Sequence, residues 1–129
     1  MTSVLQEAVV NNNYNRVKKL INDGADLKSR SSQKYTMLHV AAINGCKGIA
    51  SELIDSGVDL ESKDQYGKTA LHLAVRYGHL PIVKLLVEEG AKVNATTGRG
   101  ETPTDWALLW GQESIEKYLK ENGGEAKKY

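Results

Sequence analysis

The sequence predicts an all-α protein, a solenoid of stacked helix-turn-helix pairs. Three residue types recur every 33 positions without an insertion. The ladders are Gly24, Gly57, Gly90 and Gly123; Gly45, Gly78 and Gly111, with Asn12 in the first slot; Thr36, Thr69 and Thr102; and Leu20, Leu53, Leu86 and Leu119. A fixed period of this length is typical of proteins built from stacked repeats.

The segment 63–95 shows how each period is expected to fold. It begins with a turn in which Gly67 can adopt a positive φ. Thr69 is placed to cap a first helix, and Gly78 can end that helix in a left-handed conformation. Pro81 then stands in the first turn of a second helix, where its missing N–H costs nothing. The glycine of the first ladder ends this helix, and a loop leads to the next turn.

The other periods repeat this order, and neither helix is long enough to be stable alone in water. Stacking on the neighbouring repeats must therefore stabilise each pair. We expect one domain over residues 1–124 and a tail that frays at 125–129. The predicted repeats span about 1–29, 30–62, 63–95 and 96–124.

Composition argues against several partners. The 129 residues include 17 Lys and Arg against 16 Asp and Glu, a formal charge of +1. This balance predicts no binding to nucleic acid or to an anionic membrane. Cys46 is a single cysteine and cannot form an internal disulfide. With no apolar leader after Met1, the expected location is the cytoplasm, and the small size leaves nuclear entry open.

Two motifs resemble those of the ankyrin-repeat family. Residues 69–74 (TALHLA) and 36–42 (TMLHVAA) resemble its T-P-L-H-x-A-A signature, and residues 90–95 (GAKVNA) resemble its G-A-D-V-N-A loop. The resemblance extends over about residues 3–123, as four repeats. It implies an L-shaped stack of antiparallel helix pairs with projecting β-turn fingers. It also implies a protein-binding function without enzymatic activity, cofactor or metal, in a chain that is monomeric when free.

Three positions depart from the repeat pattern. Lys34 stands where later turns have Gly67 and Gly100, so we expect the finger of the second repeat to bend differently. Asp105 and Gln6 replace the motif histidine in the fourth and first repeats. In the family this histidine ties the helix start to adjacent loops, so these two ties are in question.

Catalytic and metal-binding alternatives have little support. His39 and His72 recur at the repeat period, and the resemblance gives them a hydrogen-bonding role. No cluster of cysteine and histidine has the spacing of metal ligands. An enzyme that uses Cys46 as a nucleophile remains a weak alternative, because no base lies near it in the sequence.

The resemblance implies that the finger tips and the exposed side of each first helix recognise the partner. Tyr, Trp and Arg are the residue types that most often anchor interfaces, and several fall on these slots. The predicted protein-binding residues are Tyr35, Ile43, Asn44, Gln65, Tyr66, Lys68, Arg76, Tyr77, Arg99, Leu109 and Trp110. Trp106 and Tyr118 align with aliphatic positions of other repeats and are predicted to be core residues.

The favoured function is a protein-protein interaction module that masks or bridges an unidentified partner protein. The alternative is a terminal fragment of a larger ankyrin scaffold, although the polar first and last repeats favour a stand-alone array. Asn94 resembles the loop asparagine that a cytosolic asparaginyl hydroxylase modifies in many ankyrin proteins. An asparagine that stabilises its own turn is the competing interpretation.

Overall fold

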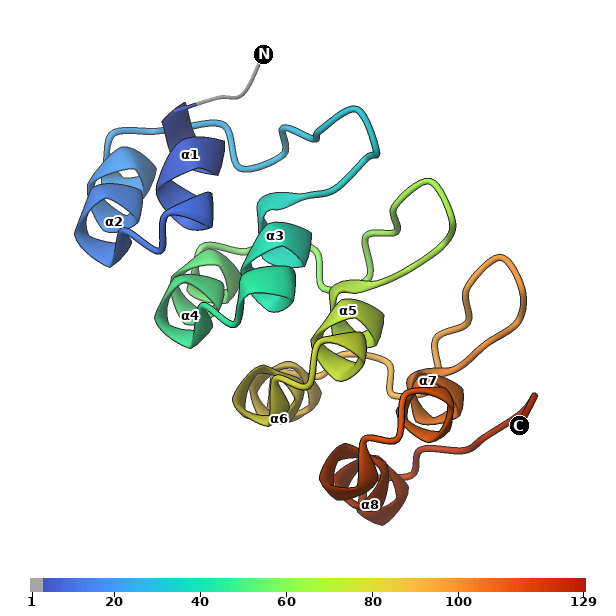
Figure 1. Ribbon diagram of the computed structural model, residues 1–129. Helices are drawn as coiled ribbons and strands as arrows, with labels where there is room; N and C mark the ends of the chain where they lie inside the picture. Colours follow the sequence, from blue (N-terminus) through green and yellow to red (C-terminus); the bar gives the residue numbers. More distant parts are fainter. Residues whose placement is uncertain (1–3) are drawn as a thin grey trace.

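The computed structural model describes residues 4–129, which form an all-α solenoid. The predicted domain begins at residue 1, and residues 1–3 lie outside the described part. This part contains eight α-helices and no strand. Figure 1 shows them as four pairs in a row. The helices are α1 (Val4–Val10), α2 (Tyr14–Asn22), α3 (Met37–Asn44), α4 (Lys47–Asp55), α5 (Ala70–Arg76), α6 (Leu80–Glu88), α7 (Pro103–Leu109) and α8 (Glu113–Glu121). The predicted fold class is confirmed.

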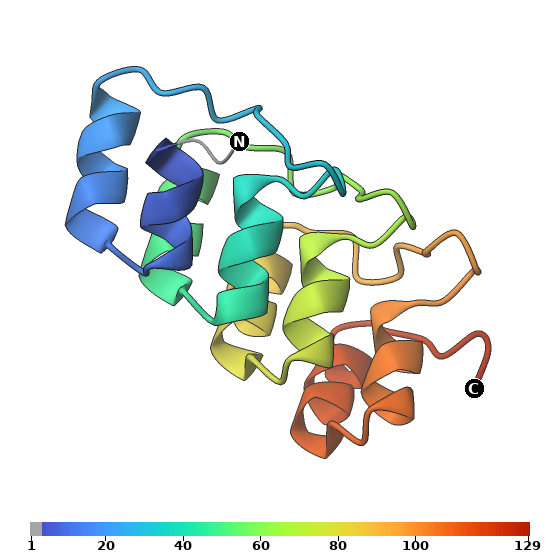
Figure 2. The same cartoon turned by 45° about the horizontal axis from the view of Figure 1, so that its top comes forward.

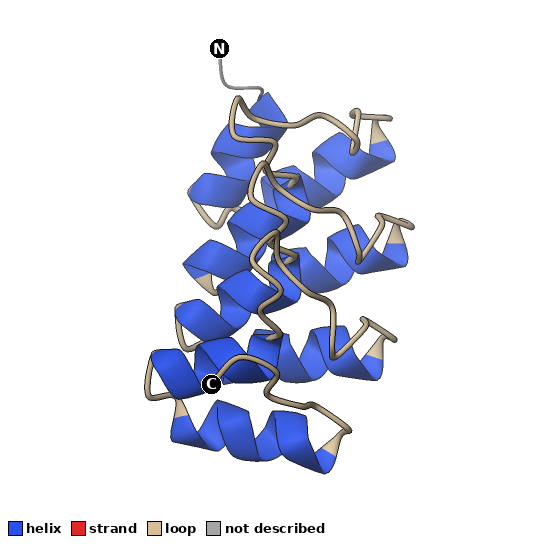
Figure 3. Cartoon of the chain, turned by 90° about the vertical axis from the view of Figure 1, so that its right-hand side faces the viewer, coloured by secondary structure: helices blue, strands red, loops and turns tan. Residues whose placement is uncertain are grey.

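The helices form two layers. The inner layer contains α1, α3, α5 and α7, and the outer layer contains α2, α4, α6 and α8. Each helix packs on its partner in the pair and on the next helix of its own layer. The long loops before α3, α5 and α7 project to one side as the fingers (Figures 2 and 3). The fingers and the inner layer therefore border the same concave face.

The inner helices α3, α5 and α7 begin where the threonine ladder predicts. In α5, the Thr69 hydroxyl accepts a hydrogen bond from the backbone N–H of His72, and the His72 ring accepts one from the backbone N–H of Thr69. These two bonds satisfy donors that a helix start leaves unpaired. Gly78 follows α5 with φ 74°, and Asn12 holds the equivalent position after α1 with φ 52°. The predicted caps are confirmed.

The hydrophobic core runs along the stack between the layers. Leu53, Leu86 and Leu119 of the leucine ladder have no exposed surface, whereas Leu20 in the first repeat is only partly buried. Because each repeat covers the apolar face of its neighbour, burial is continuous from α1 to α8.

The three fingers share one geometry, and Lys34 does not change it. Lys34 has φ 64°, close to the 82° of Gly67 and the 78° of Gly100, so the expectation of a different bend was wrong. The Ser31 N–H donates to Tyr35 O, and the Ser31 hydroxyl accepts from the Tyr35 N–H. These bonds hold the turn and keep Lys34 left-handed despite its side chain.

Replacing Lys34 with glycine should raise the free energy of unfolding by about 0.5–1 kcal/mol, because glycine has no Cβ to strain a left-handed turn. Urea denaturation of the two proteins measures this difference. Lys28→Gly, at an exposed loop position before the same finger, is the control and should not stabilise the protein. Equal or lower stability of Lys34→Gly would show that the turn is unstrained.

The tail also differs from expectation, since residues 125–129 are bonded to the last repeat instead of fraying. The backbone N–H groups of Lys127, Lys128 and Tyr129 all donate to one oxygen of Asp105, at 2.9–3.1 Å. The Glu125 carbonyl accepts from the Thr102 hydroxyl at 2.7 Å. A buried carboxylate thus supplies the acceptor that orders the tail.

Candidate functional site

The motif histidines join neighbouring repeats and are not placed for catalysis. His39 and His72 have no exposed surface. The His39 Nε2–H donates to Lys68 O and the His72 Nε2–H to Glu101 O, both at 2.9 Å, because a backbone N–H already occupies each Nδ1. Burial lowers the pKa of both rings, that of His72 to about 4, which keeps them neutral donors.

Asp105 replaces this donor with an acceptor in the fourth repeat. Its Oδ2 accepts from the Thr102 N–H, as a histidine Nδ1 would. Its Oδ1 takes the outward position of Nε2 and binds the three N–H groups of the tail. The fourth repeat is therefore also bonded to the segment that follows it, but here the side chain accepts hydrogen bonds where the motif histidines donate them. Gln6, at the corresponding place in the first repeat, is buried.

Cys46 offers no basis for nucleophilic chemistry. Its side chain is 3% exposed, and its Sγ lies 3.8 Å from the Val9 carbonyl oxygen. Burial raises the pKa of the thiol, which favours the unreactive protonated form.

Over residues 4–129, no group of three or more His, Cys, Asp or Glu side chains is arranged to hold a metal ion. No helix in the same span is both long and apolar enough to cross a bilayer.

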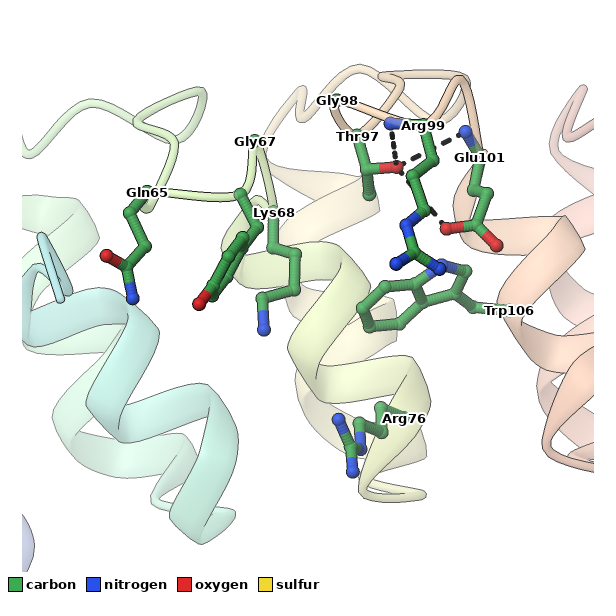
Figure 4. A pocket seen from close by; sticks show the side chains of 10 residues that line it. Gln65, Gly67, Lys68, Arg76, Thr97, Gly98, Arg99, Glu101 and Trp106 are labelled. Atoms are coloured by element: carbon green, nitrogen blue, oxygen red, sulfur yellow. Dashed lines mark hydrogen bonds between the residues drawn. The ribbon is translucent and has the colours of Figure 1, made fainter.

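A groove of about 760 Å³ lies between the third-repeat and fourth-repeat fingers, above α5 and α7 (Figure 4). We call it the finger groove. The backbone joins its two sides at the top, because the Gly98 N–H donates to Tyr66 O at 3.0 Å. The groove is lined by Gln65, Tyr66, Gly67, Lys68, Arg76, Thr97, Gly98, Arg99, Glu101 and Trp106.

Cationic side chains outnumber carboxylates in the finger groove. Lys68 lies 3.6 Å from Asp64 and is partly buried, whereas Arg76 and Arg99 are exposed. The only carboxylate in the lining is that of Glu101, which is 7% exposed and accepts from the Tyr129 hydroxyl at 2.8 Å. The groove thus presents positive charge to the solvent.

Arg76 also joins the groove to an aromatic pair, and we call Arg76, Tyr77 and Trp110 the Arg76 cluster. The Arg76 Cζ lies 5.4 Å from the Tyr77 ring centroid and 4.7 Å from that of Trp110. Both rings are 46% exposed, so the cluster combines two cation–π contacts with open apolar surface.

The predicted binding residues do not all meet in one place. Gln65, Tyr66, Lys68, Arg76 and Arg99 line the finger groove, and Tyr77 and Trp110 border it through Arg76. Leu109 is exposed beside Trp110 in the chain.

The three predicted residues of the second repeat lie apart from the groove lining. Tyr35 and Ile43 are partly buried against the core, and the Asn44 amide donates to Val40 O of its own helix. The structure thus separates these side chains from the residues that line the finger groove or border it through Arg76.

The Asn94 side chain ties the exit loop of the third repeat to the end of the fourth. Its Nδ2 donates to Gly123 O at 3.0 Å, and its Oδ1 accepts from the Glu125 N–H at 2.8 Å. These bonds join two repeats and do not stabilise the turn that contains Asn94, and hydroxylation of Asn94 stays a prediction.

Gly67, Thr97, Gly98, Glu101 and Trp106 line the groove but are not among the predicted binding residues, and Trp106 is the largest of these side chains. It is buried, as predicted for a core residue, and packs edge-on against His72 at 5.2 Å, but one edge of its indole forms a wall of the groove. The sequence did hold one sign of this role, because Trp106 brings an indole N–H to a position where the other repeats have the apolar Val40 and Leu73. Tyr118 is only partly buried, with the Lys84 ammonium 5.6 Å from its ring.

A family model described as ankyrin repeats, in three copies, matches residues 5–97. The fourth pair, α7 and α8, lies beyond the match but packs on α5 and α6 as those helices pack on α3 and α4. Comparison with curated proteins gives no match. Proteins with ankyrin repeats are generally protein-protein interaction modules.

Proposed function

The chain belongs to the ankyrin-repeat family, and we propose that it is a non-enzymatic module that masks or bridges a partner protein. The partner would contact the finger tips and the concave helix face, mainly over the third and fourth repeats. Monomeric state and cytoplasmic location belong to the same proposal, and the buried, unpaired Cys46 suits a reducing compartment.

The observation that carries this proposal is the Arg76 cluster at the edge of an open groove. Arg76 is held against two exposed aromatic rings, so it loses little side-chain freedom when a partner binds. Arg, Tyr and Trp dominate the binding energy of protein interfaces. The repeats beneath share one continuous hydrophobic core, which favours binding without a large rearrangement.

Replacing Tyr77 and Trp110 together with alanine should lower partner affinity, by about 2 kcal/mol for each anchor that is fully desolvated. The fold should remain intact because both rings lie on the surface. The partner is first captured by an unbiased pull-down in which wild type and double variant are compared, and its affinity is then measured by calorimetry.

Tyr14→Ala is the matched control, since Tyr14 is an exposed aromatic residue of the outer layer. It should leave partner affinity unchanged. If the double variant keeps its affinity while its circular dichroism and melting curve match those of wild type, the binding site lies off the concave face.

A further inference from the structure

We propose that the finger groove binds carboxylate side chains, and that the partner segment it receives is an acidic one, rich in Asp and Glu. This inference rests on the proposed function and adds the chemistry of the partner. Two independent features carry it: a buried donor without an acceptor, and cations without a carboxylate partner.

The donor is the indole N–H of Trp106. Trp106 is 7% exposed, and its Nε1 has no hydrogen-bond acceptor among residues 4–129. A buried donor without a partner is costly, so nearly all such groups are paired in folded proteins. Figure 4 shows the Arg99 side chain above this indole, inside the groove. Because Arg99 and Trp106 line the same groove, a carboxylate that pairs with Arg99 would lie in the groove that Trp106 also lines.

The cations are Arg76 and Arg99. The ion pairs formed by residues 4–129 include neither of them, whereas Lys68 already pairs with Asp64. Both guanidinium groups lie in the lining of the same groove. A guanidinium binds a carboxylate with two parallel hydrogen bonds, a geometry that a neutral amide or a second cation cannot supply.

The groove itself has few acceptors to offer a competing ligand. Its one carboxylate, on Glu101, is buried and bonded to the Tyr129 hydroxyl. A basic partner would face Arg76 and Arg99 without compensation, and an apolar partner would leave the Trp106 N–H unpaired. The volume of about 760 Å³ is large enough for several side chains of a short segment.

The first test selects peptides from a random display library on the wild-type protein and measures their affinities by fluorescence anisotropy. The selected peptides should be enriched in Asp and Glu and should bind more weakly as salt rises. Arg76→Glu with Arg99→Glu should weaken them at least about ten-fold. Lys117→Glu, a charge reversal at an exposed position of α8, is the control and should change affinity less than about two-fold.

The second test follows the Trp106 indole directly. The chain has two tryptophans, so its ¹H–¹⁵N spectrum contains two indole signals, and Trp110→Phe assigns them. A selected acidic peptide should move the Trp106 indole proton downfield, as a new acceptor engages it. The same peptide with Gln in place of Glu should leave that signal in position.

The outcomes separate the two proposals. Selected peptides without acidic enrichment that lose affinity in Tyr77→Ala with Trp110→Ala would overturn the acidic-segment inference and leave the proposed function standing. A Trp106 signal that acidic peptides do not move would also overturn it. Selection of no peptide, or of peptides that neither pair of substitutions weakens, would overturn both.

Discussion

Replacing His72 with alanine should lower the free energy of unfolding by about 2–3 kcal/mol. The substitution removes the bond to Glu101 O and leaves the Thr69 N–H without the ring that caps it. It also opens a cavity beneath Trp106, whose ring packs on the imidazole. Urea denaturation at neutral pH measures the loss.

The size of this loss should depend on pH in a direction set by the pKa of His72. Burial lowers that pKa from 6.5 to about 4 in the folded state, although the bond to Glu101 partly opposes the effect. The stability that the neutral ring provides is therefore complete above pH 6.5. It is lost as pH falls toward 4, by up to about 3 kcal/mol, because the unfolded chain then binds a proton that the folded chain does not. The gap between wild type and variant should shrink over this range.

Arg76→Ala is the control for this experiment, because it removes a surface side chain of the same helix. Its effect on stability should be small and independent of pH between 4 and 6.5. An unchanged melting curve of His72→Ala, or a gap that stays constant with pH, would contradict the buried, neutral role of the ring.

Replacing Asp105 with alanine should cost about 3 kcal/mol and release the tail. The carboxylate has no exposed surface and accepts bonds from Thr102 and from three tail N–H groups. Without it, the tail dissociates, and the buried Thr102 N–H loses its partner. Amide hydrogen exchange of residues 127–129 should accelerate in the variant together with a lower melting temperature.

Asp59→Ala is the matched control, since Asp59 is an exposed loop aspartate that accepts a single backbone bond. Burial alone would raise the pKa of the Asp105 carboxyl, but four backbone N–H bonds outweigh it and lower that pKa. The contribution of Asp105 is thus lost only as pH falls through this lowered value. Slow exchange at residues 127–129 in Asp105→Ala would show that other contacts hold the tail.

The repeat architecture was predictable because the residues that start and end each inner helix recur every 33 positions. Thr69 caps the helix that it precedes, and Gly78 takes the left-handed position that follows it. Both depend on neighbours within a few residues, which a sequence shows directly. The Arg76 cluster was predictable in part. The repeat period places Arg76, Tyr77 and Trp110 on one face, but it does not predict that the guanidinium lies against both rings.

The remainder depends on contacts between distant residues. Residues 125–129 have a polar composition typical of a frayed end, but Asp105, Thr102 and Asn94 hold their backbone through hydrogen bonds that the sequence does not show. Lys34 keeps its left-handed turn because Ser31 bonds across it. Trp106 occupies a core position of the repeat pattern. Its contact with the groove depends on the distance between two fingers, and the residues near Trp106 in the sequence do not determine that distance.

Within residues 4–129, each helix packs mainly on its own repeat and on the adjacent repeats, so the array is a short one-dimensional chain of coupled units. A ligand bound at the third and fourth repeats stabilises those two repeats most against local unfolding. This stabilisation declines from repeat to repeat toward α1. The unbound end then opens and closes while the bound end stays shut. A ligand in the finger groove should therefore raise protease resistance most in the third and fourth repeats and least in the first. The change in resistance along the chain should be steepest across the second repeat.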